Sequence, residues 1–143
     1  MDRTIAHYMT PSPHTIGVNQ PLAVAHRLMR EHNIRHLPVL DCGELVGLVS
    51  QRDLLFIETL KDVDPNQVTV AEAMSPSPYV VSPHAQLERV VANMATRKLG
   101  AAVIVQRKDV LGVFTSVDAL RVLSELLSRS RRRQLRRDVT ERT

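Results

Sequence analysis

The chain contains two copies of one unit, related by a constant offset of 65 residues. The motif Met-Thr-Pro-Ser-Pro at positions 9–13 recurs as Met-Ser-Pro-Ser-Pro at positions 74–78. The offset holds without a gap over positions 4–55, where eleven of 52 positions are identical, and core positions such as Val39 and Ile104 are exchanged conservatively. A register kept over this span indicates a duplicated fold, in which each unit buries its hydrophobic face against the other.

The apolar pattern predicts the same elements in each copy. In the first copy, a proline-rich extended stretch that includes Thr15 and Ile16 precedes an amphipathic helix over 21–32. Two strands over 37–40 and 45–49, joined by a turn at Cys42 and Gly43, and a helix from about 50 to 60 follow. We expect an α/β fold of two pseudo-symmetric strand-helix-strand-strand-helix motifs packed sheet to sheet, since neither motif alone can bury enough apolar surface.

Composition divides the chain into four parts. Residues 4–60 form the first motif, residues 61–68 an Asp-rich linker, and residues 69–127 the second motif. Residues 128–143 lose the apolar periodicity and form a basic tail, so the packed body is expected to end at position 127.

The core is expected to be aliphatic, because hydrophobic residues make up 43% of the chain and aromatic residues only 3%. No apolar run approaches the roughly 18 residues of a membrane span, and the N-terminus lacks the pattern of a signal peptide. These features predict a cytoplasmic protein. The single cysteine, Cys42, excludes an internal disulfide.

The positive charge is concentrated in the tail. From position 129 onward seven arginines face two acidic residues, which gives the tail +5 and leaves the rest of the chain at −1. The tail is interpreted as a solvated, disordered end, as a nucleic-acid or anionic-surface contact through residues 129–137, or as an extension of the last helix that packs on a partner subunit. It holds no aromatic residue that could stack on bases, which argues against base-specific recognition.

A hydroxyl residue and an aspartate three positions later follow the last strand of each copy. These pairs are Ser50 with Asp53 and Thr115 with Asp118. At a helix start, such a pair is typical of a capping box, in which the side chains satisfy free backbone amides. The same arrangement suits a nucleotide, because free amides bind phosphate and a carboxylate accepts hydrogen bonds from ribose hydroxyls. The two interpretations are compatible.

Both copies resemble CBS (cystathionine β-synthase) domains in their order of elements and in three motifs. These are the initial Met-Thr/Ser-Pro, the segment Ile-Arg-His-Leu-Pro-Val at positions 34–39, and the final Gly-x-x-Ser/Thr-x-x-Asp. The resemblance covers positions 4 to about 124. It implies a Bateman module, a pair of CBS motifs that binds AMP, ADP, ATP, S-adenosylmethionine or a dinucleotide as a regulatory ligand, with no required cofactor.

The resemblance also implies two composite clefts, in which the aspartates hold ribose and the hydroxyl residues hold phosphate. One cleft joins residues of the first copy to the second helix start: Thr15, Ile16, Arg35, His36, Leu37, Pro38, Thr115 and Asp118. The other cleft joins residues of the second copy to the first helix start: Val80, Val81, Ala101, Ala102, Val103, Ser50 and Asp53. The second copy has Gly-Ala-Ala-Val at positions 100–103 in place of Arg35-His36-Leu37-Pro38. We therefore expect the cleft with the cationic pair to be the better phosphate site.

Neither a catalytic residue nor a metal site is expected. His32 and His36 are four residues apart, but they fall at a helix end and a strand start, and no further pair of ligands completes a zinc site. The remaining histidines are expected at the surface: His7, His14, His26 and His84. No nucleophile and base, or pair of carboxylates, is arranged for catalysis.

Bateman modules typically dimerise into a flat disc, parallel or antiparallel, and the sequence leaves this choice open. Apolar residues on the helices after the hairpins are expected to form the dimer interface: Leu54, Leu55, Ile57, Leu120, Val122 and Leu123. The sequence names no effector protein. Two alternatives to the sensor function remain, a nucleic-acid-associated regulator that uses the arginine tail and a structural dimerisation module with degenerate clefts.

Overall fold

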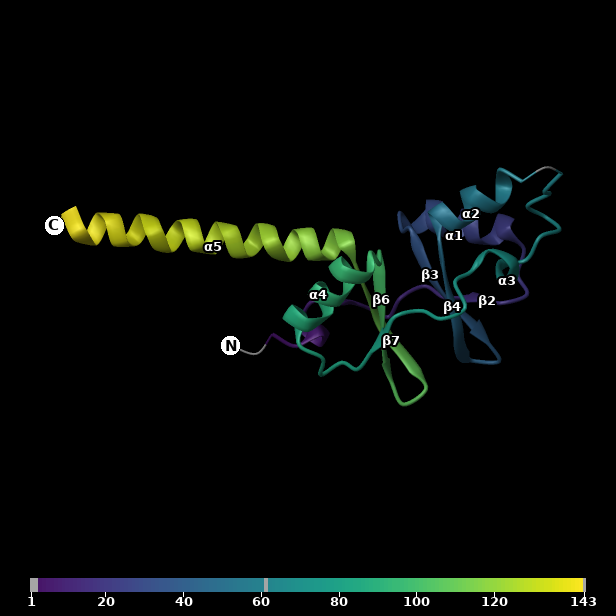
Figure 1. Ribbon diagram of the computed structural model, residues 1–143, viewed down its shortest axis with the longest axis horizontal. Coiled ribbons are helices and arrows are strands. Elements are labelled where there is room, and N and C mark those ends of the chain that lie inside the picture. Colours follow the sequence, from purple (N-terminus) through teal and green to yellow (C-terminus); the bar gives the residue numbers. More distant parts are fainter. Residues whose placement is uncertain (1–2, 61, 143) are drawn as a thin grey trace.

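The computed structural model describes residues 3–60 and 62–142. It shows two halves, each with a small sheet and covering helices, and one long helix that projects from the second half (Figure 1). The first half contains β2 (Ile16–Gly17), α1 (Leu22–His32), β3 (His36–Asp41), β4 (Glu44–Ser50) and α2 (Gln51–Glu58). The second contains β5 (Val80–Val81), α4 (Leu87–Arg97), β6 (Ala101–Gln106), β7 (Asp109–Thr115) and the start of α5 (Ser116–Arg142). The predicted order of elements is confirmed in both copies.

The two copies start and end their helices by the same local devices. Helix α1 buries Leu22, Ala25 and Met29, which its helical spacing places on one face. Helix α4 buries the matching face of the second copy. Both helices end at a residue in the left-handed conformation, Asn33 with φ 52° and Lys98 with φ 55°. The offset of the repeat is therefore preserved in the backbone.

The strands form two sheets with matching registers. The first sheet has the order β2-β3-β4, in which β2 is parallel and β4 antiparallel to β3. The second has the order β1-β7-β6-β5, where β1 is the short strand Thr10–Pro11. Both hairpins shift register at equivalent places, between Val39 and Leu40 and between Ile104 and Val105. The second sheet gains its extra strand from the first copy.

Each half has its own buried cluster. The first cluster is aliphatic throughout, as the composition predicts, and lies between α1, α2 and the first sheet. The second cluster contains the fully buried Phe114 among its aliphatic residues. Phe114 thus corrects the expectation of a purely aliphatic core.

The segments that precede each copy are exchanged between the two halves. We define residues 3–13 and 68–78 as the lead segments. In the first, Ile5 is fully buried in the core of the second half, and β1 pairs with β7, with Thr10 opposite Val113. In the second, Val70 is fully buried in the core of the first half, and Ser75 bridges to Leu48 on β4. Each half is therefore completed by the other copy's lead segment.

Two features of these segments were not expected from the sequence. The residues before each proline-rich stretch form the helical turns η1 (Ile5–His7) and α3 (Val70–Ala73). The expected linker, residues 61–68, is also bound to the first half, because the Val68 carbonyl accepts a hydrogen bond of 2.9 Å from the Leu22 amide. Lys61 of this linker and Thr143 of the tail lie outside the described residues.

Gly47 and Gly112 allow the exchanged segments to approach the strands closely. A Cβ atom at Gly47 would lie 2.8 Å from the Ser75 carbonyl oxygen, and one at Gly112 would lie 2.8 Å from the Thr10 carbonyl oxygen. Real side chains do not tolerate such contacts, so both positions require glycine. The repeat motif therefore contains a glycine because the other copy's backbone passes over it.

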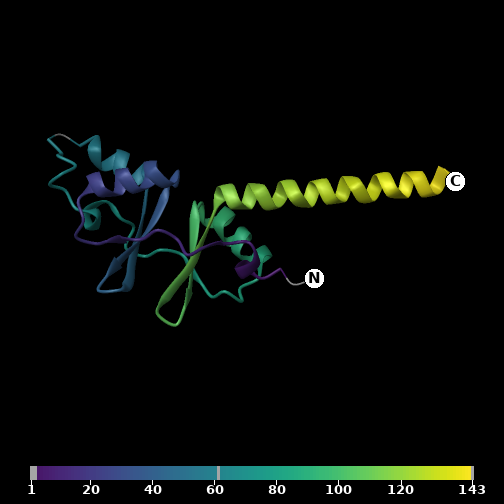
Figure 2. The same cartoon turned by 180° about the vertical axis from the view of Figure 1, so that it is seen from behind.

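Helix α5 continues without a break past the expected end of the body. It begins at Ser116 and ends at Arg142, a length of roughly 40 Å at about 1.5 Å per residue, and Figure 2 shows its far end well clear of both halves. Residues 128–142 are helical, so the alternative of a disordered tail does not hold for them. Within the described residues, no helix is long and apolar enough to cross a membrane.

The expected dimer-forming side chains differ in exposure. Leu54 is fully buried in the first core, which corrects its assignment to an exposed face. Ile57 and Val122 are half-buried against the two cores. Several large apolar side chains on α2 and α5 remain exposed: Leu55, Phe56, Val117, Leu120, Leu123 and Leu127.

Candidate functional site

The N-terminus of α2 is closed by a capping box. The Ser50 Oγ accepts a hydrogen bond of 3.1 Å from the Asp53 amide, and the Asp53 Oδ2 accepts one of 2.8 Å from the Ser50 amide. The Asp53 Oδ1 accepts no hydrogen bond from the described part of the chain. The capping interpretation is therefore confirmed for the first copy, and one carboxylate oxygen is left for another donor.

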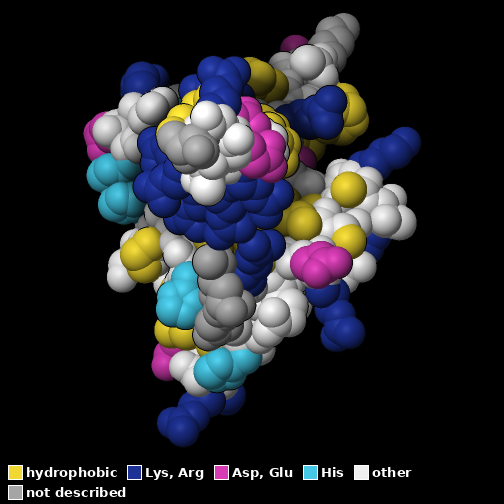
Figure 3. Space-filling model, turned by 90° about the vertical axis from the view of Figure 1, so that its left-hand side faces the viewer, with side chains coloured by type: hydrophobic (Ala, Val, Ile, Leu, Met, Phe, Trp, Pro, Cys, Tyr) yellow, Lys and Arg dark blue, Asp and Glu magenta, His cyan; other side chains and the backbone are white. Residues whose placement is uncertain are grey.

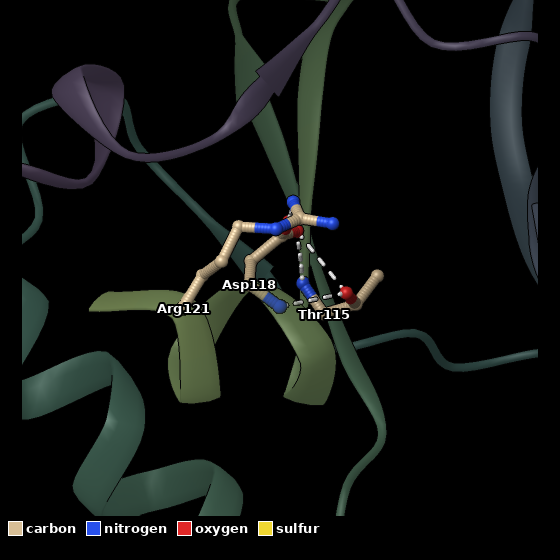
Figure 4. A network of polar contacts seen from close by, with 3 residues as sticks. All are labelled: Thr115, Asp118 and Arg121. Carbon is tan, nitrogen blue, oxygen red and sulfur yellow. Dashed lines mark hydrogen bonds and ion pairs between the residues drawn. The ribbon is translucent and has the colours of Figure 1, made fainter. Parts of the chain in front are cut away.

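The N-terminus of α5 repeats this geometry with an additional cation (Figure 4). The Asp118 Oδ2 accepts hydrogen bonds from the Thr115 amide at 2.9 Å and the Thr115 hydroxyl at 3.1 Å. The Asp118 Oδ1 forms an ion pair with Arg121 Nη1 at 3.2 Å. Asp118 is 8% exposed, and it is the buried charged residue of the described chain. Both of its oxygens are already engaged, unlike those of Asp53.

Sequence reasoning missed Arg121 as a partner of Asp118 at this candidate site. The residue lies three positions after Asp118, a spacing that puts the two side chains on one helix face, and this signal was present in the sequence. The corresponding position of the first copy is Phe56, so the ion pair belongs to the second copy alone. The two helix starts are therefore alike in their caps and different in their charge.

His36 lies at the junction of the two copies. On its own sheet it pairs with Ser50, at the end of β4. From the other copy, Gly100 approaches so closely that a Cβ atom there would lie 3.3 Å from His36 Nε2. The first residue of α2 lies beside His36, because the Gln51 amide donates a hydrogen bond of 2.9 Å to the Arg35 carbonyl. The first residue of α5 lies beside Gly100, because the Ser116 amide donates a hydrogen bond of 3.0 Å to the Gly100 carbonyl. Both helix starts therefore face one junction.

The charge state of His36 reflects this position. Burial lowers the pKa of His36 below its ordinary value of 6.5, because desolvation disfavours the imidazolium. Asp53 and Asp118 act in the opposite direction, and Arg35 lowers the pKa further. His36 thus interacts with the aspartates of both copies, and near neutral pH it is mainly an uncharged imidazole that can donate and accept hydrogen bonds.

The sheets bring the other expected residues into matching positions. Parallel pairing places Ile16 opposite Val39 and Val80 opposite Val103, and Ala101 lies opposite Thr115. The apolar residues of the strand starts are buried: Ile16, Leu37, Pro38, Ala101, Ala102 and Val103. Thr15 and Val81 are half-buried, and Arg35 and Val80 are exposed.

Two histidine expectations can be compared with the structure. His26 is half-buried, and its Nε2 lies 2.5 Å from the Glu58 Oε1, so it is not a simple surface residue. His14 and His32 stack with ring centroids 3.6 Å apart, whereas His32 and His36 were the pair considered from the sequence. Within residues 3–60 and 62–142, no three His, Cys, Asp or Glu side chains are grouped to hold a metal ion.

The comparisons with known proteins agree with the geometry. The family model of the CBS domain matches residues 5–58 and 70–125. Hypoxic response protein 1 of Mycobacterium tuberculosis is 28% identical over 113 residues, which are 77% of this chain and 78% of that protein. A crystal structure of Hypoxic Response Protein I with two coordinated zinc ions has a TM-score of 0.72, with 25% identity over 82% of this chain and 97% of that one.

Two further crystal structures are similar over most of the chain. A Vibrio cholerae structure described as an acetoin utilization protein has a TM-score of 0.80 and 28% identity, over 92% of this chain and 98% of that one. The protein CBSX2 in complex with AMP has a TM-score of 0.72 and 26% identity, over 86% of this chain and 97% of that one.

Proposed function

The chain belongs to the CBS domain family, with one match in each copy, and we propose that it is a regulatory module that binds an adenosyl ligand rather than an enzyme. The ligand class comprises AMP, ADP, ATP, S-adenosylmethionine and dinucleotides, which share adenine and ribose. CBSX2, a structural relative, is seen with AMP, which supports this class.

The observation that carries the proposal is the convergence of both helix starts on His36. Each start presents a hydroxyl and an aspartate at a helix N-terminus, where the helix dipole attracts a phosphate and a carboxylate can accept hydrogen bonds from ribose. In the proposed clefts, Asp118 and Asp53 accept hydrogen bonds from ribose, and Thr115 and Ser50 bind phosphate. His36 and Arg35 make the cleft of Asp118 the better phosphate site.

Arg121 gives that cleft a local switch in this proposal. The guanidinium occupies the Asp118 Oδ1 in the free protein, at 3.2 Å. A ribose hydroxyl that takes this oxygen releases Arg121, which is exposed and long enough to turn toward a phosphate. The Asp53 cleft has no arginine at the position that corresponds to Arg121. The two clefts should therefore prefer ligands with different numbers of phosphate groups.

Calorimetric titration of AMP, ATP and S-adenosylmethionine into the full chain tests the proposal. At one hundred times its dissociation constant, a ligand stabilises the folded state by roughly 2.7 kcal/mol, which raises Tm by several degrees. We expect at least one of the three to bind and to produce this shift. If none binds, the chain is instead a structural dimerisation module with degenerate clefts.

The module is proposed to act as a homodimer, because exposed leucines line the helices that follow both hairpins. Leu120 is 64% exposed and Leu55 is 53% exposed, an arrangement that a second copy can cover. We expect sedimentation at micromolar concentration to show twice the chain mass of 16.1 kDa. Leu120→Glu should give monomers, and Leu135→Glu, on the projecting part of α5, should stay dimeric. A monomeric wild type would refute the assignment.

The stability of the free protein should fall as pH falls below about 6.5, because the pKa of His36 is lowered on folding. In this range the unfolded histidine binds a proton that the folded one does not, so acid favours unfolding. The loss is at most about 1.4 kcal/mol per pH unit for one such group. Urea unfolding at several pH values should therefore show a shallower dependence in His36→Gln than in the wild type; identical slopes would contradict a neutral His36.

A further inference from the structure

A concave site lies outside the junction of the two copies, where α5 leaves the second half. It is a pocket of about 280 Å³ between the N-terminal lead segment and α5. Its lining contains four arginines and three other residues: Arg3, Arg129, Arg133, Arg137, Leu126, Ser130 and Gln134. No carboxylate of the described residues lines it. The pocket therefore combines a high density of positive charge with neutral hydrogen-bonding groups.

The arginines are held by two independent parts of the fold. Arg129, Arg133 and Arg137 recur every four residues, so they lie in a row on one face of α5, about 6 Å apart along the axis. Arg3 faces this row from the lead segment, whose backbone is fixed by a hydrogen bond of 2.7 Å from the Leu87 amide to the Arg3 carbonyl. The exchange of lead segments thus builds one wall of the pocket.

The face of α5 that carries the arginine row is apolar closer to the N-terminus of the helix. Val122 and Ala119 pack against the second core, and Leu126 lines the inner end of the pocket. Figure 3, which looks along α5 from its C-terminal end, shows Lys and Arg side chains gathered around the end of the helix, with a large group directly below it. The row is therefore directed by packing and is not a randomly oriented basic tail.

None of these four guanidinium groups forms an ion pair within the described residues. Like charges held in a row repel one another, and a polyanion relieves this repulsion. Arginine binds phosphate through two parallel hydrogen bonds, and each contact releases counterions. A row with a regular spacing suits successive phosphates better than a single one.

We propose that this pocket binds the phosphate backbone of a nucleic-acid strand. The contacts are to phosphates alone, because α5 beyond Ser116 contains no aromatic side chain to stack on bases, so binding should not depend on base sequence. The site is separate from the proposed adenosyl clefts, and the two can be tested independently.

The test compares two variants with the same change in charge. Arg129→Gln/Arg133→Gln/Arg137→Gln removes the row, and Arg131→Gln/Arg132→Gln/Arg136→Gln removes three arginines of α5 that do not line the pocket. Binding of a labelled oligothymidylate of about 20 nucleotides is measured by fluorescence anisotropy between about 50 and 200 mM salt. Circular dichroism verifies that α5 stays helical in both.

The pocket variant should bind at least tenfold more weakly than the control variant. The slope of log affinity against log salt concentration should be smaller in magnitude by about 2 than in the wild type, since each single-strand phosphate contact contributes roughly 0.7. Arg3→Gln alone should reduce the magnitude of this slope by about 0.7, although Arg3 lies outside the tail.

Three results would overturn the proposal. Equal losses in the two triple variants would indicate diffuse attraction by the tail. Absence of strand binding by the wild type at the lowest salt would exclude the ligand class. Tight binding of inorganic triphosphate without strand binding would assign the pocket to a small polyphosphate instead. Failure of adenosyl binding, by contrast, would leave this result unaffected.

Discussion

Asp118→Ala should weaken nucleotide binding by tenfold or more, whereas Asp53→Ala should have a smaller effect. In the proposed cleft, Asp118 accepts hydrogen bonds from ribose beside the Arg35 guanidinium and the neutral His36 imidazole. Hydrogen bonds to a charged acceptor contribute roughly 1.5 to 3 kcal/mol each, and about 1.4 kcal/mol corresponds to tenfold in affinity. Titration of ATP, AMP and S-adenosylmethionine into both variants by calorimetry gives the comparison.

The two variants control for each other, because both aspartates belong to capping boxes of the same geometry. As pure helix caps, they would affect folding by about 0.5 to 2 kcal/mol each and leave ligand affinity unchanged. Arg121→Ala adds a second control, since it frees the Asp118 Oδ1 without removing the carboxylate. Undiminished binding in Asp118→Ala, or equal losses at two identical sites, would contradict the composite-cleft assignment.

Gly112→Ala should destabilise the protein by about 1 to 3 kcal/mol, because the added methyl group overlaps the exchanged lead segment. The new Cβ would lie 2.8 Å from the Thr10 carbonyl oxygen, a backbone atom that can move only if β1 separates from β7. For a chain of this size, the loss corresponds to a fall in Tm of roughly 4 to 10 °C. Thermal unfolding followed by circular dichroism measures it.

Gly47→Ala should behave similarly, since its Cβ would meet the Ser75 carbonyl oxygen at 2.8 Å. Gly17→Ala is the matched control, because its Cβ would make only an ordinary contact of 3.5 Å with the flexible Gln20 side chain. If Gly112→Ala has the same Tm as Gly17→Ala, the lead segments are not held against the strands as described.

The paired helix starts show why part of the site could be predicted from the sequence. Ser50 and Asp53, like Thr115 and Asp118, are three residues apart, and a helix start brings such neighbours together whatever the rest of the fold does. The turn at Cys42 and Gly43 is local in the same sense, with φ values of 50° and 82°. The pair of Asp118 and Arg121 obeys the same rule, since it too joins residues three apart on one helix.

Other assignments failed because the periodicity of a helix does not reveal what covers each face. Leu54 and Leu55 are adjacent apolar residues on α2, yet the first is fully buried and the second is 53% exposed. The end of the apolar pattern likewise left the tail open between a disordered end and an extension of the last helix. The structure shows the helix, because a helix that is already nucleated and packed continues through charged residues of good helix propensity.

The sequence by itself determined the duplication, the order of elements, the turns and the helix caps, because these depend on residues close together in the chain or on a fixed offset. Only the tertiary structure decided the exchange of lead segments, the position of His36 between the copies, and the placement of Arg3 opposite the arginine row of α5. These features join positions far apart in the chain, and their stability comes from burial and close packing that no local pattern specifies.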